Sequence, residues 1–285
     1  MFYFLSPFLD EKELLNPEAI IIRKIRLPRI LSAILTGGIL SVAGVVLQSI
    51  LANPMAEPYT LGIASGAAFG ASLGILGGNI YILPSALFGA FGALILVKII
   101  ALNGGREKII LAGIITNAFL SSGVTFLKAI SGEKLYAVIL WLMGSFAGVN
   151  FDDVLRIFSG AVLVFIPAVV YAPYLDAMSL GDGRGLILGI NENLTRNILL
   201  FSVSFGVALS VSSTGITGFV GLIVPHLLRI FIGASHRNLI LNSFIFGGVL
   251  MLLSDGVAQI LGEVPAGVIT ALFGAPFFCF LLIKK

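Results

Sequence analysis

Long apolar runs alternate with short polar connections along most of the chain, from Ile30 to the C-terminus. A helix needs roughly 20 apolar residues to cross a bilayer, and nine runs approach this length, two of them short. The pattern therefore predicts an all-α, polytopic membrane helix bundle. The nine predicted spans are residues 30–51, 61–76, 80–102, 109–130, 154–171, 197–214, 219–232, 239–253 and 264–283.

Two segments depart from simple spans. Residues 138–149 are apolar but too short and glycine-rich to cross, so we expect a re-entrant or interfacial segment anchored by Trp141. The run 219–232 contains Pro225, His226 and Arg229. A proline within a membrane helix frees a backbone carbonyl that hydrocarbon cannot satisfy. This predicts a helix buried in the bundle or lining a cavity, which favours transport over simple anchoring.

Composition agrees with a membrane protein. Hydrophobic residues make up 58% of the chain, charged residues 11%, and the mean hydropathy is +1.09, whereas soluble domains carry about 25% charged residues. Small residues recur at four-residue spacing, as in Gly66 and Gly70 or Gly89 and Ala93. This spacing predicts close helix packing, because lipid provides no hydrophobic force between helices.

The basic residues predict an orientation, because short cytoplasmic loops collect Lys and Arg. A cytoplasmic C-terminus places Arg106, Lys108, Arg196 and Arg229 on the same, cytoplasmic side. Nine spans then leave residues 1–29 outside, although this segment is basic. Either these cations have an external role, or a further helix precedes Met1. We therefore predict an external segment 1–29 and a transmembrane domain 30–285.

An ordered set of local patterns covers nearly the whole chain, from Ile25 to Lys285. The set comprises IRLPR (25–29), NPMAEP (53–58), LG (61–62), LAG (111–113), WLMGS (141–145), LG (180–181 and 188–189), FVGLIVPH (219–226), Asp255, EVPAG (263–267) and GAPFF (274–278). In this order it closely resembles the FecCD-type permease subunits of ABC importers for cobalamin, ferric siderophores and haem.

The resemblance implies the type II ABC importer fold, usually with ten spans, and by comparison the span expected to be missing here is the first. It implies a homodimer in the cell membrane, in contact with lipid, bound to two ATPase subunits and an external substrate-binding protein. It implies neither a cofactor nor a nucleic-acid partner. The chain has no Gly-x-x-x-x-Gly-Lys-Ser/Thr loop, so we expect a transport subunit rather than an enzyme. The implied substrate is an iron chelate or cobalamin; molybdate or tungstate is the alternative.

The resemblance also implies three sites. Arg26 and Arg29 would face carboxylates of the binding protein, for which the planar guanidinium is well suited; the alternative is a helix anchor at the lipid headgroups. Gln259 stands where relatives often carry a third arginine. The polar loop 174–196 would form short helices that seat in the ATPase, with the coupling residues Leu180, Gly181, Gly185, Leu188 and Gly189.

The third site is a cytoplasmic gate at Gly104, Gly105, Arg106 and Glu107, where the glycines also fit an ordinary turn. His226 and His236 lack neighbouring metal ligands, so we predict no metal site.

Two other classes of protein are weighed against an importer. An ion-coupled secondary transporter needs acidic residues within the membrane, and only Asp255 qualifies weakly; we expect it to have a structural role near its helix end. A membrane scaffold or enzyme has little support, since no nucleophile–base pair is evident.

Overall fold

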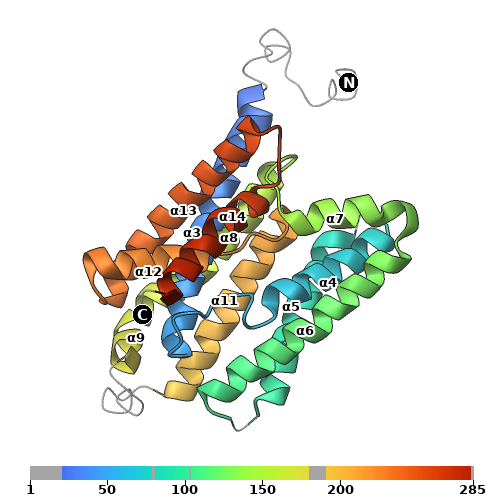
Figure 1. Cartoon of the computed structure of the whole chain (residues 1–285). Helices are drawn as coiled ribbons and strands as arrows, with labels where there is room; N and C mark the ends of the chain where they lie inside the picture. The colour runs from blue at the N-terminus through green and yellow to red at the C-terminus, as the bar shows by residue number, and fades with distance from the viewer. Residues whose placement is uncertain (1–20, 79–80, 103, 180–190, 284–285) are drawn as a thin grey trace.

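The computed structural model describes residues 21–78, 81–102, 104–179 and 191–283, and within these ranges the chain is helical without strands (Figure 1). A π-helical turn, Ile22–Arg26, leads into the first long helix. The helices are α3 (Leu27–Ile50), α4 (Ile63–Leu76), α5 (Ile82–Ile100), α6 (Arg106–Ile130), α7 (Leu135–Met143), α8 (Phe151–Val170), α9 (Ala172–Ser179), α11 (Glu192–Thr214), α12 (Val220–Ile232), α13 (His236–Ile260) and α14 (Ala266–Ile283).

Helix α3 forms the centre of the molecule. It is buried along almost its whole length and packs against α8, α11, α12 and α13. A second group, α4, α5 and α6, lies to one side, and α11 joins the two groups by packing against α3, α4 and α5 (Figure 1). We call the end of the bundle that holds the start of α3 and the end of α13 the upper end, and the opposite end, with α9, the lower end.

A helix is present at each of the nine predicted positions. Six of the described helices are long and apolar enough to cross a membrane: α3 with its preceding turn, α5, α6, α8, α11 and α13. The apolar helices α4, α12 and α14 are shorter by the same measure. The segment predicted to be interfacial, residues 138–149, begins inside α7, which is nine residues long and is capped by Gly144. It lies at the upper end, where its partly buried Trp141 packs against the core.

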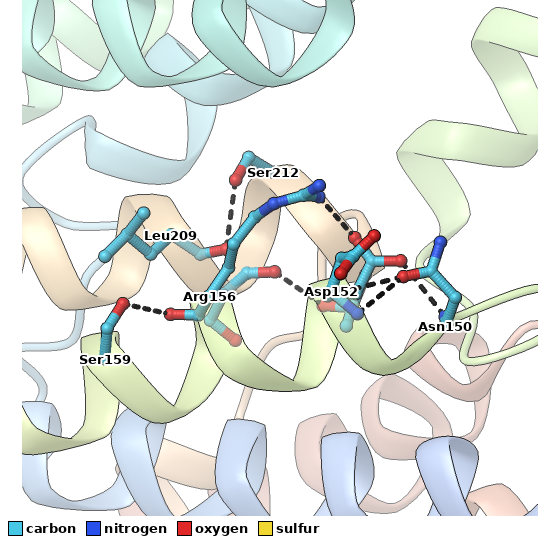
Figure 2. A network of polar contacts seen from close by, with 9 residues as sticks. Asn150, Asp152, Arg156, Ser159, Leu209 and Ser212 are labelled. Carbon is cyan, nitrogen blue, oxygen red and sulfur yellow. Dashed lines mark hydrogen bonds and ion pairs between the residues drawn. The ribbon is translucent and has the colours of Figure 1, made fainter. Parts of the chain in front are cut away.

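Polar caps set helix ends that hydrophobicity alone misplaces. Helix α8 begins at Phe151, three residues before the predicted span, because Asn150 forms a capping box. Its side chain accepts hydrogen bonds from the backbone N–H groups of Asp152 and Asp153, at 2.9 and 3.1 Å. Arg156 then donates to Asp153 at 2.7 Å (Figure 2). The first turn is therefore polar, as a helix start at the bilayer boundary requires.

Glycines allow helix backbones to touch. A Cβ atom added to Gly89 of α5 would lie 2.1 Å from the carbonyl oxygen of Gly66 in α4. The same holds where α3 meets α13, at Gly37 and Gly247, and a Cβ on Gly44 of α3 would meet the backbone of Gly221 in α12. The predicted close packing of small residues is confirmed at Gly66 and Gly89, and these contacts replace the hydrophobic drive that lipid does not supply.

We predict that Gly89→Ala lowers the stability of the solubilised protein by about 1–3 kcal/mol, because the new methyl group overpacks the contact with α4. Gly92→Ala, one turn further along α5, is the matched control, since its Cβ would meet nothing within 4 Å. It should be neutral or stabilise by up to about 1 kcal/mol. Thermal unfolding in detergent measures both; equal melting temperatures for the two variants would contradict the packing argument.

Candidate functional site

A buried ion cluster closes the upper end. Arg29, in the first turn of α3, donates from Nε and Nη2 to the two carboxylate oxygens of Asp255 on α13, at 2.8 and 2.9 Å. It also contacts Glu263, in the loop between α13 and α14, at 2.8 Å. The side chains of Arg29 and Asp255 are 11% and 2% exposed. Such a bidentate pair fixes both direction and distance, so it locks the start of α3 to the end of α13.

The residues around this ion cluster differ in how far they are exposed at the upper end. Gln259 donates its amide to Asp255 at 2.8 Å, so the residue that replaces a third arginine joins the same cluster. Glu263 is 57% exposed and adopts a φ of +64°. Arg26 is exposed in the turn before α3. Of the two predicted docking arginines, Arg29 therefore contacts carboxylates of its own chain, whereas Arg26 points into the surroundings.

A second polar cluster joins three helices at the lower end. Asp176 of α9 accepts hydrogen bonds from the backbone N–H of His236, at 2.9 Å, and from its Nδ1, at 2.7 Å. The other ring nitrogen of His236 bonds the Ser49 hydroxyl near the end of α3. His236 is the first residue of α13, so Asp176 caps this helix from outside and its charge faces the positive end of the helix dipole. The helix-end role expected of His236 fits these contacts.

Gln48 makes a further link at the same end. Its amide donates to the Gly221 carbonyl of α12 at 2.9 Å, and its oxygen accepts from Arg229 near the end of α12. Because Pro225 lies inside this helix, the Gly221 carbonyl is the one that loses its intrahelical donor. The side chain of Gln48 supplies the missing hydrogen bond, which explains how a buried proline is tolerated here.

The predicted gate residues lie where α5 turns into α6. Gly105 precedes α6, which begins with Arg106 and the exposed Glu107. Gly104 lines a cavity of about 450 Å³ together with Lys98 and residues of α11. The five predicted coupling residues, Leu180, Gly181, Gly185, Leu188 and Gly189, lie outside the described residues; α9 and α11 flank them.

The sequence analysis missed Glu57. It lies in the loop between α3 and α4 and accepts a hydrogen bond from the backbone N–H of Phe219, which precedes α12. Burial raises the pKa of Glu57 to about 7, and the Phe219 hydrogen bond offsets part of this shift. Glu57 and Tyr59 line a cavity of about 480 Å³ beside Phe219. The available signal was that Glu57 is the only charge between Arg29 and Lys98.

The clusters have no evident catalytic or metal chemistry. Within the described ranges, His, Cys, Asp and Glu side chains form no group of three that could hold a metal ion. What the contacts do is join helices: Arg29 and Asp255 join α3 to α13 at the upper end, and Ser49, His236 and Asp176 join α3, α13 and α9 at the lower end.

A family model, the FecCD transport family, matches residues 5–284. The chain belongs to the FecCD transport family. It is therefore a transport subunit of the permease type, a multi-pass protein of the inner membrane, as the resemblance implied.

Relatives cover most of the chain. A Helicobacter pylori protein, named as an iron chelatin transport system permease, is 39% identical over 284 residues, which cover 97% of this chain and 86% of that protein. The molybdate import system permease MolB of Haemophilus influenzae is 37% identical, with 93% and 81% covered. A solved structure assigned to a metal-chelate type ABC transporter, in an inward-facing conformation, has a TM-score of 0.88 at 37% identity, with 94% and 88% covered.

We predict that Asp255→Ala destabilises the protein by about 3–5 kcal/mol, since it leaves the buried Arg29 with only the exposed Glu263 as a partner. Glu263→Gln, the control in the same cluster, should cost less than about 1 kcal/mol, because exposed ion pairs contribute little. Melting temperatures in detergent test both. Similar, small losses for the two variants would mean that the buried pair does not hold α3 to α13.

We predict that stability depends on pH through Glu57. Its pKa of about 7 in the folded protein lies above the value of about 4.3 in an unfolded chain. The folded state thus favours the protonated form, so stability falls as pH rises from about 5 to about 7.5. Glu57→Gln, which stays neutral, should lose this dependence. Parallel melting curves for wild type and variant between pH 5 and 8 would contradict it.

Proposed function

We propose that this chain is the permease subunit of an ABC importer that carries an iron chelate, of a siderophore or of haem, or cobalamin across the membrane. ATP hydrolysis on a partner ATPase would drive transport, and the chain itself would not bind ATP. The observation that supports this most directly is the likeness, over 94% of the chain, to a transporter of the metal-chelate ABC type.

Uptake into vesicles tests the proposal. The permease is reconstituted with its ATPase and binding protein, and ATP-dependent uptake of a ferric siderophore, haem, cobalamin and molybdate is compared. We expect uptake of one metal chelate and none without ATP. Uptake of molybdate alone would favour the second candidate, for which the 37% identity to MolB is the specific support. Uptake driven by an ion gradient without ATP would overturn the importer class.

The lower cluster supports a coupling role for the loop 174–196. Helix α9 leads directly into the residues proposed to contact the ATPase, and Asp176 ties α9 to His236 of α13. His236 in turn contacts α3. A displacement of the loop by the ATPase would therefore pull on α13 through hydrogen bonds to the Asp176 carboxylate, which contribute about 1.5–3 kcal/mol each, and on α3 through the hydrogen bond between His236 and Ser49.

We predict that Asp176→Ala lowers ATP-driven uptake about tenfold or more while ATP hydrolysis continues. The variant loses the hydrogen bonds between α9 and α13, which are worth at least about 1.5 kcal/mol. Arg237→Ala, an exposed change one residue beyond His236, is the control and should keep normal uptake. The ratio of substrate moved to ATP hydrolysed is the readout. An unchanged ratio for Asp176→Ala would show that this contact does not couple ATP hydrolysis to transport.

The gate proposal rests on Gly104, Gly105, Arg106 and Glu107. Neither glycine has a positive φ. A Cβ on Gly105 would meet nothing within 4 Å, whereas one on Gly104 would lie 2.6 Å from the Cβ of Lys108, which is fixed to the backbone of α6. The observed conformation therefore favours glycine at position 104 but does not demand it at position 105. Two glycines still add backbone freedom, which a segment that changes shape during transport would use.

The docking proposal now assigns different parts to the two arginines. Arg26 would pair with a carboxylate of the external binding protein, while Arg29 would hold the surface in place through Asp255 and Glu263. Gln259 adds no charge to this surface. The chain would present these groups twice, because we also propose that the transport pathway lies between two copies in a homodimer bound to two ATPase subunits.

We predict that Arg26→Glu weakens binding of the binding protein about fivefold at low salt, since an exposed interfacial pair is worth at most about 1 kcal/mol. The effect should shrink at high salt. Lys24→Glu makes the same charge change in the same exposed turn and is the control. Equal losses for the two variants would indicate a general charge effect, and unchanged affinity for Arg26→Glu would leave only the helix-anchor interpretation.

A further inference from the structure

Two cavities meet along the seam between α5 and α11. The first, of about 450 Å³, lies at the lower ends of these helices and reaches the start of α6. The second, of about 570 Å³, runs along α11 toward α8. Both are lined by Lys98 and Asn197. A single long molecule could therefore occupy both, with Lys98 and Asn197 where they join.

The first cavity is cationic. Lys98 and Arg196 line it, with Asn193 and Asn197 as further hydrogen-bonding groups, and no carboxylate belongs to its lining. Arg196 is held by a hydrogen bond from its guanidinium to the Asn193 side chain, at 2.9 Å. Glu192, one turn earlier on α11, does not line the cavity. Two cations with neutral amide donors beside them match the chemistry of a phosphate group.

The second cavity is apolar. Leu163 and Pro167 of α8 and Phe201 and Phe205 of α11 form most of its wall. The hydroxyl of Ser202, also in the wall, is directed to the Leu199 carbonyl of its own helix. Phe201 and Phe205 stack loosely with Phe91 of α5, with ring centroids 5.6 and 5.0 Å from it. Apart from Lys98 and Asn197, at the junction of the two cavities, the wall is thus largely apolar and includes two aromatic rings.

The surroundings of the second cavity indicate that it faces lipid. Three apolar residues within one helical turn of its lining residues Lys98 and Pro167 are all more than half exposed: Ile95 and Ile99 of α5 and Ile166 of α8. In a bundle that crosses the membrane, an open apolar groove between spanning helices must be filled by acyl chains, because water there is costly. The charge of Lys98 and Arg196 favours an anionic headgroup on the lipid whose acyl chain fills this groove.

We propose that this seam is a binding site for one anionic phospholipid. An acyl chain lies in the groove of Leu163, Pro167, Phe201 and Phe205, and the phosphate lies between Lys98 and Arg196. The lower end is the predicted cytoplasmic side, where anionic lipids attract basic residues. Because Gly104 lines the same cavity, the headgroup would touch the segment between α5 and α6. This inference does not depend on which substrate is transported.

Native mass spectrometry of the detergent-solubilised protein tests the site. Dioleoyl phosphatidylglycerol is compared with dioleoyl phosphatidylcholine over a range of concentrations. Each cation near a membrane surface favours an anionic lipid, so we expect about tenfold tighter binding of phosphatidylglycerol. The double variant Lys98→Gln with Arg196→Gln should lose this preference, and Lys98→Arg should keep it. Arg237→Gln, which removes a lower-end cation that lines neither cavity, should bind like the wild type.

Three further results would overturn the proposal. Equal binding of phosphatidylcholine and phosphatidylglycerol by the wild type would remove the role of the cations. Displacement of the lipid by millimolar inorganic phosphate would indicate a site for a free anion instead. Equal affinity for dihexanoyl and dioleoyl phosphatidylglycerol would mean that the groove holds no acyl chain. A double variant that melts like the wild type but keeps its lipid preference would also refute the assignment.

Discussion

The close contact between α3 and α13 is the constraint on which the rest of the bundle depends. Gly37 and Gly247 bring the two backbones together, so no side chain separates these helices at their crossing. Since α8, α11 and α12 also pack around α3, its position determines theirs. In lipid such contacts must rely on packing and hydrogen bonds, which is why small residues lie where a soluble protein would place leucine.

The buried carboxylate and amide groups described above are tolerated in the bundle because they are paired. Asp255 is 2% exposed, and an unpaired carboxylate at this depth would cost several kcal/mol. Arg29 and Gln259 together provide three hydrogen bonds to it. Gln48 similarly donates a hydrogen bond to the Gly221 carbonyl, which lacks an intrahelical donor because of Pro225. Arg29, Gln259 and Gln48 are thus each matched to a specific charge or backbone defect, whereas several buried hydroxyl groups, such as those of Ser32, Ser41 and Ser243, have no hydrogen-bond partner among the described residues.

Hydrophobicity along the chain was sufficient to locate the helices, because burial in lipid requires long apolar runs whatever the fold. It misplaced the start of α8, where Asn150 and Asp153 make the polar capping box. It also could not foresee the pairing of Asp176 with His236, 60 residues apart, or of Arg29 with Asp255, 226 apart. These pairs form because the ends of distant helices meet in the folded bundle, and the local spacing of residues in the sequence does not reveal which ends meet. Glu57 was visible as an isolated charge, but its contact with Phe219 depends on the path of the loop.

The two polar clusters lie at opposite ends of the same helix pair. Arg29 with Asp255 fastens α3 to α13 at the upper end, and Ser49 with His236 fastens them at the lower end, while Gly37 and Gly247 hold the middle. Two helices joined at three points resist both splaying and sliding, so we expect α3 and α13 to move together. We expect any movement within the subunit to fall between this pair and the group of α4, α5 and α6, across the seam that α11 forms with α5.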